Sequence, residues 1–282
     1  MTIKYLAGNR LTGSNAERLA LTSTYGWQDF DGSADYVSIP ASPLSGIGGS
    51  DDFSIAFWIK SDNFAGGSQP VILGCHHSDT ESYTTYFELY EISGALVIRS
   101  TNSSSASVVT TSSLTGIEDD AWHHIAVIRS GSTLTFYKDG SSSSTHTLSG
   151  HTLPAPETYL HIGRRGDNAQ YCDMQLQDLG FWSRALSSAD VSVLAGGVPI
   201  DRAVLATAYT TDLEGYYKFN GNYNDSKSGS SNHGTGVSTA DPNTTSGGKF
   251  HSFSDIPIQS IFSEWDTGDH YIWSGSAWNL MS

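Results

Sequence analysis

Three oxygen-bearing side chains, Asp178, Asp225 and Asn232, have the chemistry of a calcium site. Calcium takes six to eight oxygen atoms from carboxylates, amides and backbone carbonyls, usually on a flexible loop. Asp225 and Asn232 lie in a stretch rich in Gly and Ser, and the strand alternation through Met174 and Leu176 directs Asp178 inward. An inward carboxylate needs a cation or hydrogen-bond donors. The sequence therefore predicts a structural calcium ion, and leaves open a self-bonded Asx-rich turn instead.

A second group of residues has the chemistry of sugar recognition. Arg165, Asn168 and Tyr171 belong to one glycine-containing turn, and Tyr83 stands in another loop. Aromatic rings stack on sugars, while polar side chains orient the hydroxyl groups. We expect any glycan site to lie on loops at one end of the fold and to use these four residues.

The paired carboxylates of a glycosidase have one approximate match, between Glu264 and Asp269. A retaining mechanism needs two carboxyl groups about 5 Å apart on one surface. This segment coincides with a turn near the end of the chain, and no Ser or Cys nucleophile motif accompanies it. We therefore expect no enzymatic activity, with a glycoside hydrolase as the third-ranked alternative.

Two pairs of adjacent histidines, His76-His77 and His123-His124, raise the question of zinc. Adjacent residues of a strand face opposite sides of a sheet, so neither pair chelates one ion as a unit. We expect His124 to be a hydrogen-bonded framework residue.

Composition excludes several classes of function. The 282 residues carry a net charge of −15, which opposes binding to nucleic acids and to anionic membranes. No stretch approaches the roughly 20 apolar residues of a membrane helix. Two cysteines, Cys75 and Cys172, do not make a disulfide framework, and the sequence leaves their pairing open.

Hydrophobic alternation predicts an antiparallel, strand-rich fold. Phe53, Ile55, Phe57 and Ile59 have the period of two that buries one face of a sheet. Similar alternation recurs over residues 86–92, 95–99, 123–129, 133–138 and 159–162. One short helix is predicted after Ser187, which with Asp190 approximates a capping box, and Gly196-Gly197 ends it.

The chain divides into three parts. Residues 1–24 lack any apolar period and are predicted to form an N-terminal arm. Residues 25–250 contain the main β domain, including a long polar loop over 220–249. Residues 251–282 concentrate aromatic residues between turns and predict a small C-terminal β-meander, which we expect to mediate assembly together with the arm.

Several segments, in order, resemble the laminin-G-like family of concanavalin-type jelly rolls. The resemblance covers roughly residues 29–240. It rests on Phe30-Asp31-Gly32, the strand from Phe53 to Lys60, Ala121-Trp122-His123-His124, Phe136-Tyr137-Lys138-Asp139-Gly140, and the stretch from Leu176 to Ser187. Residues 215–226 resemble the first strand and loop of the family but follow the helix, so the domain is predicted to be circularly permuted.

This resemblance implies an all-β, concanavalin-like antiparallel β-sandwich, with one short helix and the small C-terminal meander. It also implies calcium near Asp178. More loosely, the arm and the segment from Glu264 to Trp278 are similar to phage and related viral structural proteins. We therefore expect a non-enzymatic virion or extracellular surface protein, a homo-oligomer that binds host glycan or partner subunits. A purely structural decoration or fibre subunit is the alternative.

Overall fold

The computed structural model describes most of the chain between residues 27 and 237 and several strands near the two termini. The described residues are 4–6, 10–13, 27–40, 50–64, 69–76, 86–101, 107–109, 114–148, 153, 159–166, 169–197, 200–203, 205–219, 222–227, 229–230, 232–237, 261–264, 270–273 and 278–281. They belong to two compact units, one formed by residues 27–249 and the other by residues 1–26 together with 250–282.

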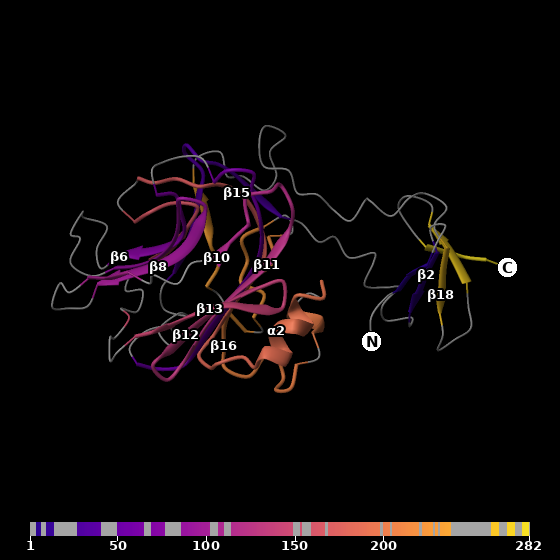
Figure 1. Cartoon of the computed structure of the whole chain (residues 1–282). Helices are drawn as coiled ribbons and strands as arrows, with labels where there is room; N and C mark the ends of the chain where they lie inside the picture. Colours follow the sequence, from indigo (N-terminus) through magenta and orange to yellow (C-terminus); the bar gives the residue numbers. More distant parts are fainter. Residues whose placement is uncertain are drawn as a thin grey trace. The chain divides into compact units, whose positions relative to one another are not determined.

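The larger unit is a sandwich of two antiparallel sheets (Figure 1). The seven-stranded sheet consists of β13 (Ser141–Thr147), β12 (Thr133–Lys138), β11 (His123–Ser130), β5 (Phe53–Lys60), β15 (Asp173–Trp182), β16 (Leu213–Tyr217) and β3 (Gln28–Asp31). The eight-stranded sheet consists of β10 (Leu114–Thr115), β8 (Ala95–Thr101), β7 (Tyr86–Ile92), β6 (Val71–His76), β14 (Tyr159–Ile162), β4 (Tyr36–Pro40), β17 (Thr235–Val237) and β9 (Ser107–Val109).

The core lies between the inner faces of the two sheets. The predicted alternation is confirmed, because Phe53, Ile55, Phe57 and Ile59 of β5 are all fully buried. Val37 and Ile39 supply the equivalent inner positions of β4. Successive strand residues point to opposite faces, so each sheet also has an outer face whose residues are the alternate ones.

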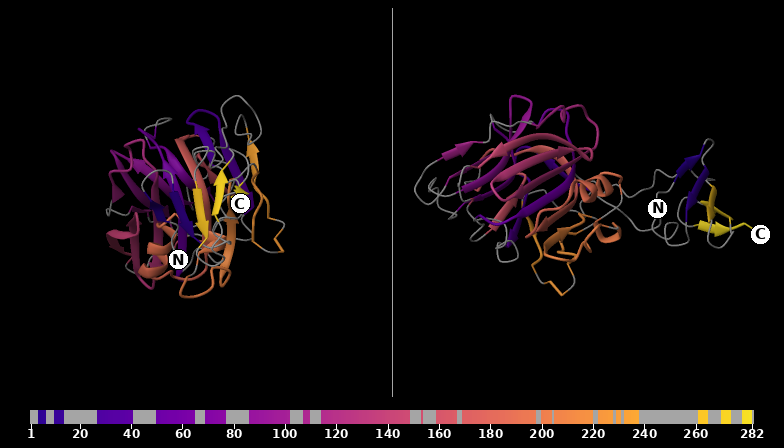
Figure 2. Two further views of the ribbon diagram at one scale, coloured as in Figure 1. Left: turned by 90° about the vertical axis from the view of Figure 1, so that its right-hand side faces the viewer. Right: turned by 60° about the horizontal axis from the view of Figure 1, so that its bottom comes forward.

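The single predicted helix is confirmed as α2 (Ser188–Leu194). Ser187 is its N-cap and forms the capping box with Asp190. Val191 and Leu194 are buried, and α2 lies beside β13 (Figure 1). Figure 2 shows the ribbon from two further sides. A short 3-10 turn, η2 (Ile200–Arg202), follows. Among the described residues, no helix is long and apolar enough to cross a membrane.

The strand after the helix has the position that the permuted order predicts. β16 pairs with β15, the strand that closes the sequence resemblance. The long loop predicted over residues 220–249 contains a further strand, β17, which pairs with β4 at the edge of the eight-stranded sheet. Thr-Gly-Val is too short and too weakly alternating to be recognised from sequence.

The smaller unit contains a five-stranded sheet built from both ends of the chain. Its strands are β1 (Lys4–Leu6), β2 (Arg10–Gly13), β18 (Ile261–Glu264), β19 (His270–Trp273) and β20 (Trp278–Leu280). β2 and β18 pair in parallel, so segments that the sequence divides into an arm and a separate meander contribute to one sheet.

Gly163 provides a test of how tightly the core is closed. Its φ is +86°, and an added Cβ would lie 2.6 Å from Cδ1 of the buried Phe30. Gly163→Ala should destabilise the protein by about 2 to 4 kcal/mol, from backbone strain plus overpacking. Gly131→Ala is the matched control, since Gly131 has a φ of +58° and open space around it, and should cost about 1 kcal/mol. Urea denaturation measures both, and equal effects would contradict this account.

Candidate functional site

Asp178 is buried at an irregularity in β15. Its partners belong to the layer on the outer side of the sheet, so the prediction that it points the same way as Met174 and Leu176 was wrong. The register of β15 against β5 shifts between Gln177 and Gly180, and Asp178 has a φ of +54°. Its Oδ1 accepts a hydrogen bond from the Tyr216 hydroxyl (2.5 Å), and its Oδ2 accepts one from the Ile200 amide (3.1 Å). Burial raises the pKa of Asp178 to about 7, although both hydrogen bonds act to lower it.

Asp225 and Asn232 hold the loop that follows β16. Asp225 Oδ1 accepts hydrogen bonds from the amides of Tyr216 (2.9 Å) and Lys227 (3.0 Å), while Oδ2 accepts one from the Ser230 hydroxyl (2.5 Å). The Asn232 side-chain amide donates to Ser230 Oγ (3.2 Å). Tyr216 therefore connects Asp178, through its hydroxyl, with Asp225, through its backbone amide.

These contacts decide how well the three residues suit calcium. Each oxygen of both carboxylates already accepts a hydrogen bond from the protein. Among the residues that the structure describes, no group of three or more His, Cys, Asp or Glu side chains is arranged to hold a metal ion. The arrangement fits the self-bonded alternative better than a calcium shell, and calcium binding stays a prediction.

The predicted sugar-binding residues Arg165 and Tyr171 belong to one hairpin, whereas Tyr83 and Asn168 lie outside the described residues. The hairpin connects β14 to β15 and is closed by the bonds from the Cys172 amide to the Gly163 carbonyl and from the Arg165 amide to the Ala169 carbonyl (both 2.9 Å). It also contacts β6, where the Val71 amide donates to the Gln170 carbonyl (3.0 Å). Cys75 and Cys172 are both buried, and they do not form a disulfide with each other.

Beside this hairpin, aromatic and polar side chains line the outer face of β4 and β14. We call Tyr36, Ser38, Tyr159, His161 and Arg164 the tyrosine face. The Tyr159 and His161 rings are stacked (6.1 Å between centroids, 28°), and the His161 ring meets Tyr36 edge-on (5.6 Å). The Arg164 guanidinium lies 3.4 Å from the Tyr36 ring centroid. Ser38 Oγ and His161 Nδ1 are hydrogen-bonded at 2.9 Å.

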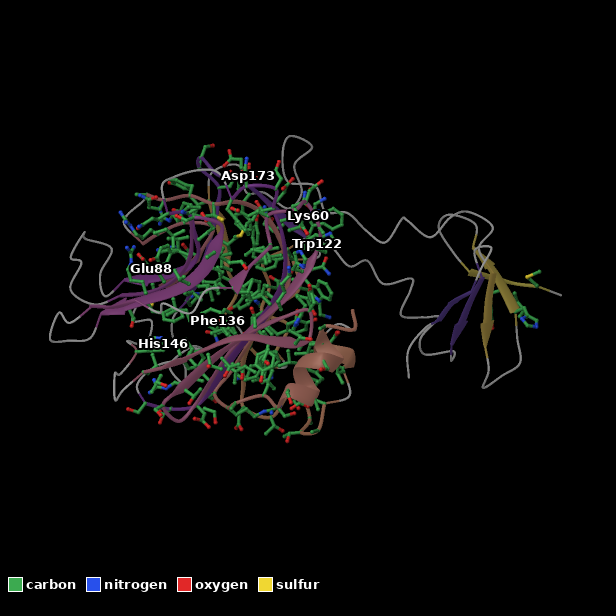
Figure 3. The ribbon with its side chains drawn as sticks, in the orientation of Figure 1. Lys60, Glu88, Trp122, Phe136, His146 and Asp173 are labelled. Atoms are coloured by element: carbon green, nitrogen blue, oxygen red, sulfur yellow. The ribbon has the colours of Figure 1, made fainter. Side chains whose placement is uncertain are left out.

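The tyrosine face continues as a polar row across the eight-stranded sheet. In register, the row reads Arg99, Glu88, Gly74, His161, Ser38 and Thr235. Arg99 pairs with the buried Glu88 (2.5 Å) and lies over the Tyr90 ring (Figure 3 labels Glu88). The β14 end of the row is more open, because Tyr159 keeps 39% of its surface exposed and Thr235 is exposed.

The residues of the hairpin were predicted from the sequence as a sugar site, but those of the tyrosine face were not. The sequence contained one signal for this face, which is the alternation of polar and apolar residues in two short strands. In β4, Tyr36 and Ser38 alternate with Val37 and Ile39. In β14, Tyr159 and His161 alternate with Leu160 and Ile162. Each run is only four or five residues long. Nothing local shows that β4 and β14 are neighbours, because about 120 residues separate them.

The framework histidine prediction was wrong in its choice of residue. His123 is the hydrogen-bonded one, with Nδ1 2.8 Å from Asp139 Oδ2 and Nε2 3.0 Å from Asp119 Oδ1. His124 is buried, and its Nδ1 has no hydrogen-bond partner among the described residues. The turns beside His123 supply two carboxylates, whereas His124 packs edge-on against the Trp58 ring.

With this geometry established, comparison with known families identifies the fold. The profile of the concanavalin A-like lectin/glucanases superfamily, Laminin_G_3, matches residues 31–192, which is more than half of the chain. The chain belongs to this family. A comparison with curated protein sequences found no match.

One solved structure with a TM-score above 0.5 has this fold, and two others are similar at lower scores. A Bacteroides ovatus protein, provisionally described as carbohydrate binding, is 14% identical with a TM-score of 0.53, over 82% of this chain and 60% of its own. The receptor binding domain of botulinum neurotoxin D is 12% identical (TM-score 0.49), over 61% of this chain and 44% of its own. The heptameric SAP-like pentraxin of Limulus polyphemus is 18% identical (TM-score 0.43), over 77% and 97%.

The raised pKa of Asp178 predicts a specific pH dependence. Folding raises this pKa from 3.8 to about 7, so the folded state binds the extra proton between these values and loses stability as pH rises through them. Asp178→Asn removes this loss, because the amide can still accept from Ile200 and donate to Tyr216. The stability of Asp178→Asn relative to wild type should therefore increase by about 4 kcal/mol between about pH 4 and pH 8.

Urea denaturation across this pH range measures the difference between the two proteins. A difference that does not vary with pH would show that the carboxyl ionises normally. Repeating the series with calcium also tests the calcium prediction, because a cation on Asp178 would lower its pKa and remove the pH dependence.

Proposed function

We propose that this protein is a non-enzymatic, lectin-like module that binds a glycan on its tyrosine face. The observation that carries the proposal is the exposed Tyr159 ring, which stacks on His161, whose ring in turn meets Tyr36 edge-on on the same sheet face. Aromatic faces bind the C–H surfaces of pyranose rings, and the Ser38 and Thr235 hydroxyls and the partly exposed Arg165 guanidinium offer hydrogen bonds to sugar oxygens.

Two further observations support this proposal. The family includes lectins by name, and the Bacteroides ovatus protein of similar fold is provisionally described as carbohydrate binding. On the polar row, Glu88 is 1% exposed and held by Arg99. A carboxylate in that state is poorly placed for the acid–base chemistry of a glycosidase, which supports binding without hydrolysis.

A virion or extracellular surface is the setting that we propose, with host glycan as the ligand. A second candidate function is assembly with other subunits, and the five-stranded sheet favours it. Near its C-terminal edge, Leu280 is 60% exposed and Met281 is 44% exposed. Exposed large apolar side chains at one site are typical of contact surfaces.

The glycan proposal predicts the effect of Tyr159→Ala. Loss of one aromatic stacking contact should weaken glycan binding by about tenfold. The melting temperature should change little, because Tyr159 is the most exposed ring of the face. A glycan array identifies the ligand with the wild-type chain, and isothermal titration calorimetry then measures the affinity.

Tyr159→Phe is the matched control, since it keeps the ring and should retain most of the affinity. Wild-type protein that binds no glycan on a broad array would refute the proposal. Equal affinity of the wild type and Tyr159→Ala would remove the tyrosine face from it.

The assembly function predicts the effect of deleting residues 251–282. This deletion removes β18, β19 and β20 but leaves the sandwich of residues 27–249 with its own core. The truncated chain should keep the β-type circular dichroism spectrum and cooperative melting, and should lose self-association in size-exclusion chromatography with light scattering. A chain without residues 1–26 as well is the control. Unfolding of the truncated chain, or unchanged association, would contradict the assembly function.

A further inference from the structure

The outer face of the seven-stranded sheet is divided into a covered half and an open half. Over the covered half, α2 and the segment after it pack on small residues, Ala56, Ala126 and Gly180. Trp182 lies in that interface with no exposed surface, and its indole N–H donates to the Tyr209 carbonyl (2.8 Å). This half is a closed hydrophobic layer.

The open half carries large side chains at the strand positions that point to the outer face, as Ala56 and Gly180 do in the covered half. Trp58 and Lys60 follow Ala56 on β5, and Gln175 and Gln177 precede Gly180 on β15. All four are half-buried, although their neighbours Phe57, Ile59 and Leu176 are fully buried. We call Trp27, Trp58 and Trp122, with Lys60, Gln175 and Gln177, the tryptophan face.

Two tryptophans meet across this face. Gln28, Leu176, Ile59 and His123 form one register row over β3, β15, β5 and β11. Trp27 and Trp122 directly precede the two end members of that row, yet their ring centroids are only 5.6 Å apart in an edge-to-face contact. The two side chains therefore reach toward each other over β5 and β15, and both stay half-exposed.

The third tryptophan rests on a neutral histidine. Trp58 and His124 are cross-strand partners, and their rings meet edge-to-face at 5.4 Å. His124 is only 2% exposed, and burial lowers its pKa to about 4, so its ring is uncharged near neutral pH. An uncharged ring beneath Trp58 fixes the indole without attracting a counter-ion.

The polar groups of the tryptophan face are the side-chain amides of two glutamines and the ammonium group of Lys60, which is paired with a carboxylate. Lys60 pairs with Asp120 (2.8 Å), and Gln175 lies between Lys60 and Asp29 in register. Figure 3 labels Lys60 and Trp122. Side-chain amides donate and accept hydrogen bonds together, as sugar hydroxyls do. The net charge of −15 opposes a polyanionic ligand.

We propose that the tryptophan face is a second binding site, for a neutral oligosaccharide of gluco-configured pyranose units. In β-linked units of this kind all ring substituents are equatorial, so each face presents axial C–H groups that stack on an indole, while the rim of hydroxyls reaches Gln175, Gln177 and Lys60. This site lies on the other sheet from the tyrosine face and does not depend on the function proposed for that face.

A structural role alone accounts less well for the exposure of the three rings. In the covered half of the same sheet, α2 and the segment after it bury the outer face completely, and Trp182 has no exposed surface. The tryptophan face is not closed in that way, and hydrogen-bonding side chains stand among its rings.

The test uses the full chain with cellohexaose, laminarihexaose and chitohexaose as probes, and an oligogalacturonate hexamer as the anionic control. At least one neutral probe should bind in isothermal titration calorimetry and change tryptophan fluorescence, and the uronate should not. Trp122→Ala should weaken that binding by about tenfold, and Trp122→Phe should restore most of it. The titrations are made in the Tyr159→Ala background, so that any binding at the tyrosine face does not contribute.

A measurement on the wild type alone covers the case in which Trp122→Ala does not fold. Bound probe should protect Trp27, Trp58 and Trp122 from oxidation by N-bromosuccinimide, as mapped by mass spectrometry. No binding of any neutral probe, binding unaffected by Trp122→Ala, or binding without protection would each overturn the proposal. Concentration-dependent protection without saccharide would also overturn it, and would indicate a contact between copies of the chain.

Discussion

The buried Asp178 carboxyl is the interaction on which the arrangement of the seven-stranded sheet depends. β15 pairs with β3 over its first half and with β16 over its second, and Asp178 stands where the partner changes. Its two oxygens bind the Tyr216 hydroxyl on β16 and the Ile200 amide at the start of η2. One side chain therefore anchors both β16, within the sheet, and the segment after α2 that covers this half of its outer face.

This irregularity also separates two environments on that face. Gln177, before the shift, belongs to the open tryptophan face, whereas Gly180, after it, lies under the Trp182 ring and Ile200, where a Cβ would come within 2.7 Å of both. A bulge redirects side chains and ends pairing locally. Here it allows one strand to serve a sealed layer and an accessible surface at once.

The two candidate surfaces share a physical design on opposite sides of the sandwich. Each places half-exposed aromatic rings beside hydrogen-bonding groups on the outer parity of adjacent strands, supported by a buried histidine ring, His161 in one and His124 in the other. Rigid strands hold such rings in place at little cost in conformational entropy on binding. This design suits recognition of extended ligands better than a catalytic cleft.

Much of this protein was determined by local sequence. The alternation in β5 and the cap at Ser187 predicted that strand, the helix and the all-β class of the larger unit, because side-chain alternation and helix capping depend on residues close together in the chain. The short strand β17 could not be predicted in this way. The burial of Asp178 was also predictable, but its direction was not, because the irregularity between Gln177 and Gly180 turns its carboxylate toward Tyr216 and Ile200 on the outer side of the sheet.

Only the tertiary structure decided which groups meet. Tyr159 reaches Tyr36 through His161, and Trp27 reaches Trp122, by strand pairings between segments far apart in sequence. Whether donors or a cation surround Asp178 depends on Tyr216 and Ile200, which the fold brings to it. The alternation of residues along a strand shows which face of the sheet each side chain occupies. Which side chains are its neighbours on that face depends on how distant strands pair, and no local pattern specifies that pairing.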